Sequence, residues 1–183
     1  MTIHIRPVIL DDADSLIVYV QSLARELDCD ILLEPNEFQA TLEEEQSFIS
    51  SYLQSDNSLF LVAHLDDGSI VGALNMDGGR LRSIRHVVSL GISVAKNYRN
   101  QGIGRRLMQS AIEWAKGTGF INRVELQVTV RNAPALHLYR KFGFLIEGRK
   151  KRALHRLGMM HDVYCLALLF DSDCTLGSSF VAT

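Results

Sequence analysis

The turn that contains Gly102 and Gly104 has the residue types and spacing of an anion-binding site. An alternating stretch typical of a strand precedes it, and apolar residues at helical spacing follow it. Glycine lets the backbone turn without a Cβ clash and brings its N–H groups close to a ligand, while the start of a helix adds partial positive charge. The turn is therefore predicted to bind an anion, and a pyrophosphate suits it best.

Two common phosphate motifs do not match this turn. A dinucleotide fingerprint needs a third glycine at position 107, where the chain has Leu107, and a P-loop needs a Gly-Lys-Ser/Thr that the sequence lacks. The incomplete glycine pattern disfavours a nucleotide-binding domain. For the glycines alone, a plain turn that joins a strand to a helix remains an alternative.

The elements on either side must hold the turn in place. Positions 88, 90, 92 and 94 are apolar and alternate with Ser89, Gly91 and Ser93, which predicts a strand with one apolar face and makes Gly91 a suitable place for a β-bulge. Apolar residues at helical spacing predict a helix over 103–116, with Gly117 as its C-terminal cap.

The rest of the chain predicts further helices and strands. A short strand at 2–7 precedes an amphipathic helix that Asp11 can cap, and Thr41 with Glu44 forms a capping box for a second helix. The expected buried stripe of this second helix is Phe48, Ile49, Tyr52 and Leu53. Further strands are expected at 59–65, 70–76, 124–130, about 144–150 and 160–170, and another helix is expected from Asn132. The strand-helix-strand order around 103–116 implies a parallel crossover.

Composition limits the class of protein. A chain of 183 residues, 47% of them hydrophobic, is enough for one core, and its net charge of -2 gives no reason to expect a nucleic-acid partner. No segment has the pattern of a signal peptide or a membrane span, so no membrane partner is expected. The histidines form no metal-binding motif. Three widely spaced cysteines, Cys29, Cys165 and Cys174, are expected to be reduced thiols in a cytoplasmic protein.

A second motif lies thirty residues after the turn. It is Asn132-x-x-Ala135-x-x-x-Tyr139-x-Lys141-x-Gly143-Phe144. Together with Arg99-x-x-Gly102-x-Gly104, it resembles the GNAT superfamily of acyl-CoA-dependent N-acetyltransferases, whose acyl-CoA motif is Gln/Arg-x-x-Gly-x-Gly/Ala. The resemblance covers roughly residues 3–170 and is sharpest over 90–108 and 130–144.

The resemblance implies a fold. We expect an α/β (α+β) protein with a mixed central sheet of about seven strands, splayed between strands 4 and 5 and flanked by about four helices. Residues 1–170 would form a single domain. Residues 171–183 have no periodicity and are expected to be a flexible tail, although Phe180 and Val181 could dock on a partner, and the sequence is compatible with a homodimer.

The resemblance also implies where acetyl-CoA, the co-substrate, would bind. Backbone groups of Ile92, Ser93 and Val94 would hold the pantetheine arm, and a backbone N–H near Val94 would stabilise the oxyanion. N–H groups of Gln101, Gly102, Ile103, Gly104 and Arg105 would bind the pyrophosphate. The side chains of Arg99 and Arg105 rank below this backbone, since exposed arginines are often only solvated. The other cofactor-binding positions implied are Asn100, Asn132, Ala135, Tyr139 and Lys141.

Catalysis needs an acid and a base. Tyr139 occupies the family's general-acid position and would protonate the leaving thiolate, and the alternative is a core tyrosine on the buried face of its helix. Many family members use a glutamate on the fourth strand as the base, but no carboxylate occurs between Asp77 and Glu113. His86 is the nearest titratable group, and a surface histidine is an equal alternative. Glu147 is a weaker candidate, and solvent could also serve.

Two charged stretches bear on the acceptor. The acidic stretch carries Asp28, Asp30, Glu34 and Glu37, and the basic stretch, expected in the loop before the last strand, carries Arg149, Lys150, Lys151, Arg152, His155 and Arg156. Opposite charges would suit a zwitterion, whereas two solvated surfaces are the plain alternative.

We therefore predict an N-acetyltransferase that moves the acetyl group of acetyl-CoA directly to a primary amine, either of a small molecule such as an amino acid or of a protein N-terminus. A non-catalytic acyl-CoA-binding regulatory module is the alternative, because the expected strand carboxylate is missing.

Overall fold

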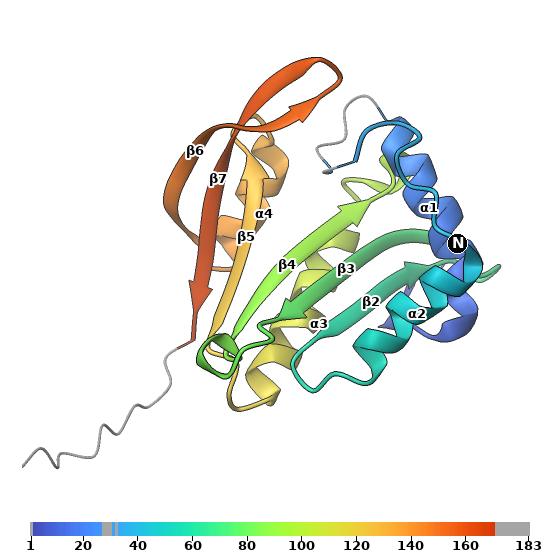
Figure 1. Cartoon of the computed structure of the whole chain (residues 1–183), viewed down its shortest axis with the longest axis horizontal. Helices are drawn as coiled ribbons and strands as arrows, with labels where there is room; N and C mark the ends of the chain where they lie inside the picture. Colours follow the sequence, from blue (N-terminus) through green and yellow to red (C-terminus); the bar gives the residue numbers. More distant parts are fainter. Residues whose placement is uncertain (1, 27–30, 32, 171–183) are drawn as a thin grey trace, which may run out of the picture.

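The computed structural model describes residues 2–26, 31 and 33–170, and a single seven-stranded sheet runs through them (Figure 1). Its strand order is β1-β2-β3-β4-β5-β7-β6, with the β4–β5 pair parallel and the other neighbours antiparallel. The strands are β1 (His4–Pro7), β2 (Leu59–His64), β3 (Ile70–Gly78), β4 (Val87–Val94), β5 (Arg123–Thr129), β6 (Leu145–Arg156) and β7 (Met159–Leu169). The predicted mixed sheet is thus confirmed.

Helices cover both faces of this sheet (Figure 1). The front face, covered by α1 (Ala13–Arg25) and α2 (Leu42–Leu53), carries a core that includes Leu16, Ile49 and Phe60. The back face, covered by α3 (Ile103–Gly117) and α4 (Ala133–Lys141), carries the larger core. Of the described helices, none combines the length and the apolar character that crossing a bilayer demands.

The feature that opens the sheet is the divergence of β4 from β5. The two strands pair only where residues 87–89 face residues 123–125, yet β4 continues to Val94 and β5 to Thr129. Beyond this short paired stretch the strands separate, as Figure 1 shows. The predicted splay between strands 4 and 5 is therefore present.

Several local predictions were wrong at helix ends. The first α-helix begins at Ala13 after a 3-10 turn, so Asp12 and not Asp11 is its N-cap residue. The Asp12 carboxylate accepts hydrogen bonds from Arg6 at 2.6 and 2.8 Å and from the Ile9 N–H at 2.9 Å, which fixes the turn before the helix. After α3, the left-handed residue is Gly119 (φ +74°), since Gly117 is still helical.

Other predictions erred in the strands and in the second helix. In α2 the Thr41–Glu44 capping box is present, but of the four residues of the expected stripe only Ile49 and Tyr52 point inward, and Phe48 and Leu53 are about half exposed. The expected bulge at Gly91 is absent, since the β3–β4 register is continuous. A Cβ at Gly91 would lie 2.6 Å from Asn75 Oδ1, so the glycine makes room for a neighbouring side chain.

The final hairpin is longer than predicted. β6 runs to Arg156, and its register shifts twice, between Ile146 and Gly148 and between Lys150 and Leu154. The basic stretch therefore lies in β6 and not in a loop. The sequence did not predict a strand here because the two register shifts interrupt the alternation that marks one.

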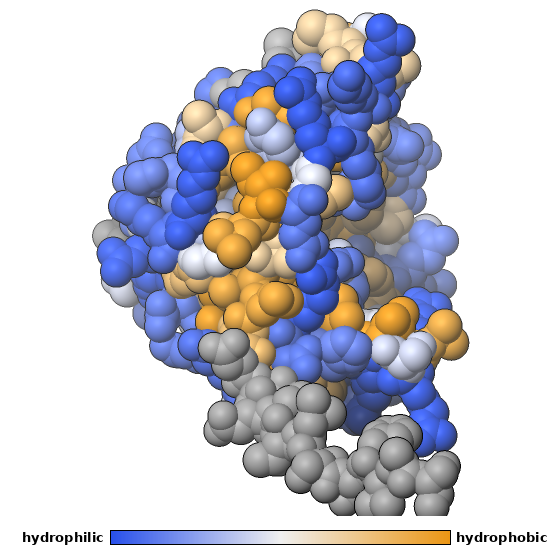
Figure 2. All heavy atoms as spheres, turned by 90° about the vertical axis from the view of Figure 1, so that its left-hand side faces the viewer, coloured by the Kyte–Doolittle hydropathy of each residue, from blue (hydrophilic) through white to orange (hydrophobic). Residues whose placement is uncertain are grey.

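Figure 2 looks onto this side of the molecule, where apolar side chains form a patch between hydrophilic ones. The exposed apolar residues of the hairpin are Leu145, Ile146, Met159, Met160 and Leu169.

Candidate active site

The open edge of β4 faces the gap between β4 and β5. Ala95 donates its N–H to Val71 O (2.9 Å), and Val87 O accepts from the Gly79 N–H (3.0 Å), so the odd-numbered residues of β4 bond to β3. Strand backbone groups alternate between the two sides, so those of Ile92 and Val94 point toward β5. Because β5 pairs with β4 only as far as Ser89, these groups face the gap.

The three predicted arm-binding residues therefore differ in what they can do. The Ile92 and Val94 N–H groups face the gap, whereas Val94 O already accepts a 3.0 Å hydrogen bond from Arg99 Nε. The Ser93 backbone faces β3 opposite Ala73, and its hydroxyl lies 2.9 Å from the Tyr19 hydroxyl on the front face. Ser93 thus anchors α1 to the sheet.

The glycine turn starts α3 without a side-chain cap. Gly102 is the N-cap residue with φ +78°, no side chain among the described residues caps the helix, and the first helical bond runs from Arg106 N–H to Gly102 O at 3.0 Å. The N–H groups of Ile103, Gly104 and Arg105 therefore project from the helix start, where the helix dipole favours an anion.

The turn lies beside the open end of β4. A Cβ at Gly104 would lie 3.5 Å from Leu138 of α4 and 3.9 Å from side-chain carbons of Ile92 and Val94. The start of α3, one face of α4 and the open edge of β4 therefore meet at one place, and the gap opens toward the glycine turn.

The polar side chains of the turn have mixed roles. Arg99 pairs with Glu26 at the end of α1, so it holds the turn in place. Gln101 Nε2 donates to Asn97 O at 3.1 Å, and Asn100 takes a left-handed conformation with φ +61°. Arg105 is exposed and lines a shallow depression next to Gly102. Of the two arginines, Arg105 is the better placed for a phosphate.

Asn132 and Lys141 of the second motif occupy the two ends of α4. Asn132 Oδ1 accepts the Ala135 N–H at 3.1 Å and so caps the helix, as Pro134 in the first turn favours. Lys141 is exposed at the other end.

Tyr139 is 6% exposed, and its ring packs against Phe144 with 5.8 Å between centroids. Burial raises the pKa of Tyr139 to about 12. No described group hydrogen-bonds its hydroxyl, yet no fully buried side-chain oxygen in the described chain lacks a partner, so the hydroxyl oxygen reaches accessible surface. The Tyr139 ring is thus part of the core, as in the alternative of a core tyrosine on the buried face of its helix. Its hydroxyl is nevertheless accessible to a ligand.

The predicted bases lie away from the gap. His86 is exposed and precedes the paired stretch of β4 and β5, so that stretch separates it from the open edge. Glu147 is bound by Arg123 at 2.9 and 2.6 Å, and this hydrogen bonding lowers the pKa of Glu147. A lowered pKa makes a carboxylate a weaker base.

A polar cluster that the sequence analysis missed lies on the front face. Tyr52 of α2 donates to Asp77 Oδ1, and Asn75 Nδ2 donates to Asp77 Oδ2 at 2.7 Å and to the Tyr52 hydroxyl at 3.3 Å. The sequence did hold one signal for it: Asn75 and Asp77 alternate with the buried Leu74 and Met76, which places the two polar side chains together on the opposite face of the strand. The contact with Tyr52 was not in the sequence, because α2 is far from β3 along the chain.

Four of the charged side chains that suggested a zwitterion bind the chain itself. Arg149 pairs with Asp162 at 2.6 Å, and the buried Arg156 donates to backbone carbonyls. Glu34 accepts the Leu157 N–H at 2.9 Å, and Glu37 accepts the Glu34 N–H at 2.8 Å. Asp28 and Asp30, like the tail from 171, lie outside the described residues.

Comparison with known proteins places this geometry in a family. Residues 24–144 match the model of the acetyltransferase (GNAT) family. An L-amino acid N-acetyltransferase of Escherichia coli (strain K12) is 39% identical over 101 residues, which are 55% of this chain and 62% of that relative. An N-alpha-acetyltransferase of Sulfurisphaera tokodaii is 31% identical over 129 residues, 66% of this chain and 77% of that relative.

A solved structure agrees along nearly the whole chain. A GNAT-family acetyltransferase of Streptococcus pneumoniae superposes with a TM-score of 0.88 at 34% sequence identity, covering 93% of this chain and 100% of that one. The family model covers well over half of the sequence. This chain belongs to the GNAT acetyltransferase family.

Proposed function

We propose that this protein is an acetyl-CoA-dependent N-acetyltransferase that transfers the acetyl group directly to a primary amine. The observation that carries the proposal is the open edge of β4, whose Ile92 and Val94 N–H groups face a gap that ends at the uncapped start of α3. An extended thioester with a phosphate at one end suits this arrangement, since the arm can add to the edge as a strand would.

The proposed roles follow from position. The first-turn N–H groups of α3 and the Arg105 side chain bind the pyrophosphate, and the gap-facing N–H groups of β4 hold the arm and stabilise the oxyanion. Tyr139 donates its hydroxyl proton to the departing thiolate. Its raised pKa keeps that hydroxyl protonated at neutral pH.

The acceptor class is proposed from the relatives. One is named for L-amino acids and another for N-alpha acetylation, so a primary α-amino group, free or at a protein N-terminus, is the first class to test. The absence of a cysteine pairing pattern in the sequence supports a cytoplasmic location.

The test measures free-thiol release from acetyl-CoA with L-leucine, its methyl ester, isoamylamine and a peptide with a free N-terminal alanine, and confirms products by mass. We expect Tyr139→Phe to lower kcat by about 10²-fold or more and to leave the Kd for acetyl-CoA within about twofold, because it removes only the proton donor. Tyr164→Phe, at a partly buried tyrosine of β7, is the control and should keep wild-type kcat.

The rival reading is a module that binds acyl-CoA without turnover. It would be supported if the protein bound acetyl-CoA but released no thiol with any amine of the panel. An unchanged kcat in Tyr139→Phe would show that Tyr139 is not the proton donor, but it would not contradict the proposed transferase activity.

A further inference from the structure

The proposed reaction needs a group that takes a proton from the amine, and β4 carries no carboxylate. Ser89 is the last β4 residue that pairs with β5. In the register of the sheet, Ser89 lies between Asp77 of β3 and Glu125 of β5. Paired residues place their side chains on the same face, so all three lie in one row across the front face at the point of divergence. Two carboxylates therefore flank the place where the gap begins.

These two carboxylates differ in their partners. Glu125 Oε2 is paired with Arg123 Nε at 3.0 Å, so its charge is already matched by a cation. Asp77 is held by neutral groups, with Tyr52 bonded to one oxygen and Asn75 to the other. A carboxylate oxygen can accept more than one hydrogen bond, so Asp77 keeps free acceptor sites.

The cluster reaches the open stretch of β4 through Asn75. Asn75 lies opposite Gly91, and its Oδ1 occupies the space that a side chain there would need. Gly91 lies between Ser89, the last residue paired with β5, and Ile92, the first whose N–H is open to the gap. The phosphates bind at the far end, beyond Val94, so the thioester end of an extended arm points toward this region.

A second observation comes from α2. Glu45 is 5% exposed, and no described group hydrogen-bonds its carboxyl group. It lies two helical turns before Tyr52 on the same inward face, and its charge acts on the Tyr52 hydroxyl. Burial raises the pKa of Glu45. No fully buried side-chain oxygen in the described chain lacks a partner, so the Glu45 carboxyl oxygens reach accessible surface, where a cationic ligand can meet them.

Resting on the proposed function, we propose that Asp77 accepts the proton of the acceptor ammonium group, with Glu45 supplying the second negative charge of a site that recognises the acceptor as a cation. The acceptor then approaches from the front face, while Tyr139 of α4 acts from the back face, with the thioester in the gap between them.

The step is balanced as follows. One ammonium N–H bond breaks and its proton moves to Asp77, and the free amine forms the C–N bond at the thioester carbonyl. The C–S bond then breaks, and the thiolate takes the Tyr139 proton. The amide nitrogen loses a second proton, which restores Tyr139 through solvent, and Asp77 returns its proton to solvent, so one proton is released in total.

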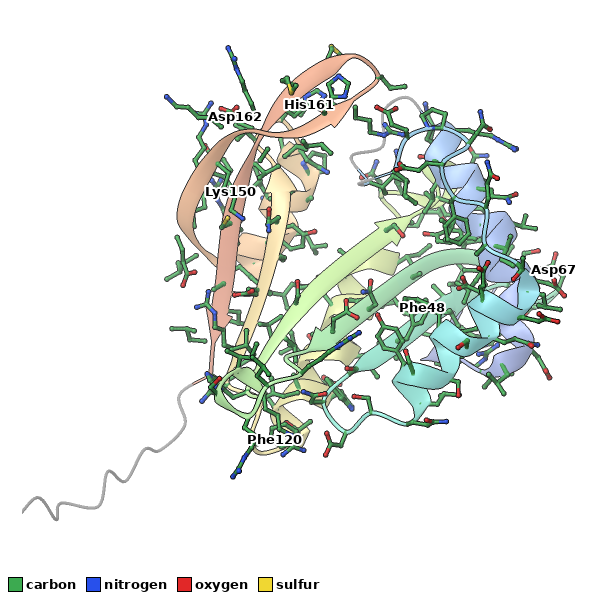
Figure 3. All side chains as sticks on the ribbon, viewed as in Figure 1. Phe48, Asp67, Phe120, Lys150, His161 and Asp162 are labelled. Atoms are coloured by element: carbon green, nitrogen blue, oxygen red, sulfur yellow. The ribbon has the colours of Figure 1, made fainter. Side chains whose placement is uncertain are left out.

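The test uses the most active amine of the panel and follows kcat/KM from pH 6 to pH 10 in the full chain. We expect Asp77→Asn to lower kcat/KM for the amine by 10²- to 10⁴-fold at pH 7 with the KM for acetyl-CoA unchanged, as is typical of a lost general base. The deficit should shrink about tenfold per pH unit as the free amine becomes abundant in solution. Asp67→Asn, in the distant β2–β3 turn labelled in Figure 3, should have no effect.

Two further variants keep the test decisive if Asp77→Asn folds poorly. Tyr52→Phe keeps the ring contacts with Phe48 and Phe60 (5.1 and 5.2 Å between centroids) but removes one donor that orients Asp77. We expect kcat to fall severalfold while the KM values for acetyl-CoA and for the amine stay unchanged. The groups that face Asp77 and would contribute to the pH profile of kcat/KM are Tyr52 and Glu45 of α2 and Glu125 of β5.

The second variant is Glu45→Gln, which should raise the KM for the amine at least fivefold. Its control is Glu43→Gln, on the exposed side of α2, which should leave that KM unchanged.

A wild-type enzyme that is active while Asp77→Asn stays within threefold of it, or shows the same deficit at every pH, overturns this inference. An unchanged kcat in Tyr52→Phe or an unchanged amine KM in Glu45→Gln would also contradict it. No thiol release by the wild type with any amine would instead overturn the proposed function, so the two failures are distinguishable.

Discussion

At the scale of single residues, the glycines of the turn have different requirements. Gly102 has φ +78°, a conformation that other residues adopt only with strain, whereas a Cβ at Gly104 would make ordinary contacts at 3.5 Å and beyond. The pattern Gly-x-Gly therefore contains one glycine needed for its backbone and one that leaves an approach to the helix start open.

This difference gives a paired prediction. Gly102→Ala should lower the free energy of unfolding by about 1 kcal/mol and weaken CoA binding about tenfold, because the strained turn relaxes and moves the first N–H groups of α3. Gly104→Ala should keep its free energy of unfolding within about 0.5 kcal/mol of the wild type, which makes it the control for stability. Chemical denaturation measures the stability of both variants, calorimetric titration with CoA measures the binding by Gly102→Ala, and an equal loss of stability in the two variants would contradict the assignment.

The sequence predicts such residues well where a local pattern carries the chemistry. The turn, the Asn132 cap and the Thr41 capping box could all be predicted, because each depends on neighbours within a few positions. The Asp77 cluster could not, since its meaning depends on Tyr52, 25 positions earlier, and on the register with Ser89. Those contacts exist only after the sheet and α2 have packed.

At the scale of elements, α4 is short and depends on its cap. It spans nine residues, Ala133–Lys141, a length that is marginal without packing and termination. The Asn132 side chain accepts from the Ala135 N–H, and the helix carries Tyr139 toward the gap. Asn132 therefore fixes the start of the helix that carries the proposed acid, Tyr139.

We expect Asn132→Ala to lower the free energy of unfolding by about 1 kcal/mol, the usual effect of losing a side-chain cap. Asn132→Ser should recover more than half of that loss, because its hydroxyl can accept the same N–H. Thermal and urea unfolding check the pair. No recovery by serine would show that Asn132 acts through some other contact.

Elements with irregular register were the least predictable. The alternation in β4 identified it as a strand, yet β6 was predicted to end near residue 150, because two register shifts interrupt its pattern. The apolar stripe of α2 was also overestimated, since helical spacing does not say how wide the covered face is.

At the scale of the whole molecule, Arg156 joins the two halves that the gap separates. Its guanidinium is 2% exposed and donates to Leu33 O at 2.9 Å and to Ala24 O and Glu26 O at 3.0 Å. The end of β6 is thereby connected to the end of α1 and the chain after it. Figure 1 shows these segments facing each other across the open end of the sheet.

Replacing this group should loosen that end. Arg156→Met should lower the free energy of unfolding by about 3 kcal/mol, because it leaves several buried carbonyls without their donor. Hydrogen exchange should rise both at the end of α1 and in the β6–β7 hairpin. Lys150→Met, exposed on the same strand and labelled in Figure 3, should change neither quantity. A rise confined to the hairpin would show that the connection does not couple the halves.

The order of strands at the end of the sheet also affects how the chain can fold during synthesis. β7 inserts between β5 and β6, so the outer edge of β5 has no partner until the last strand has left the ribosome. A nascent chain that has already produced the glycine turn and α4 still exposes that edge, and unpaired strand edges recruit other chains. Translation that stalls before residue 159 would therefore leave an aggregation-prone intermediate that needs a chaperone.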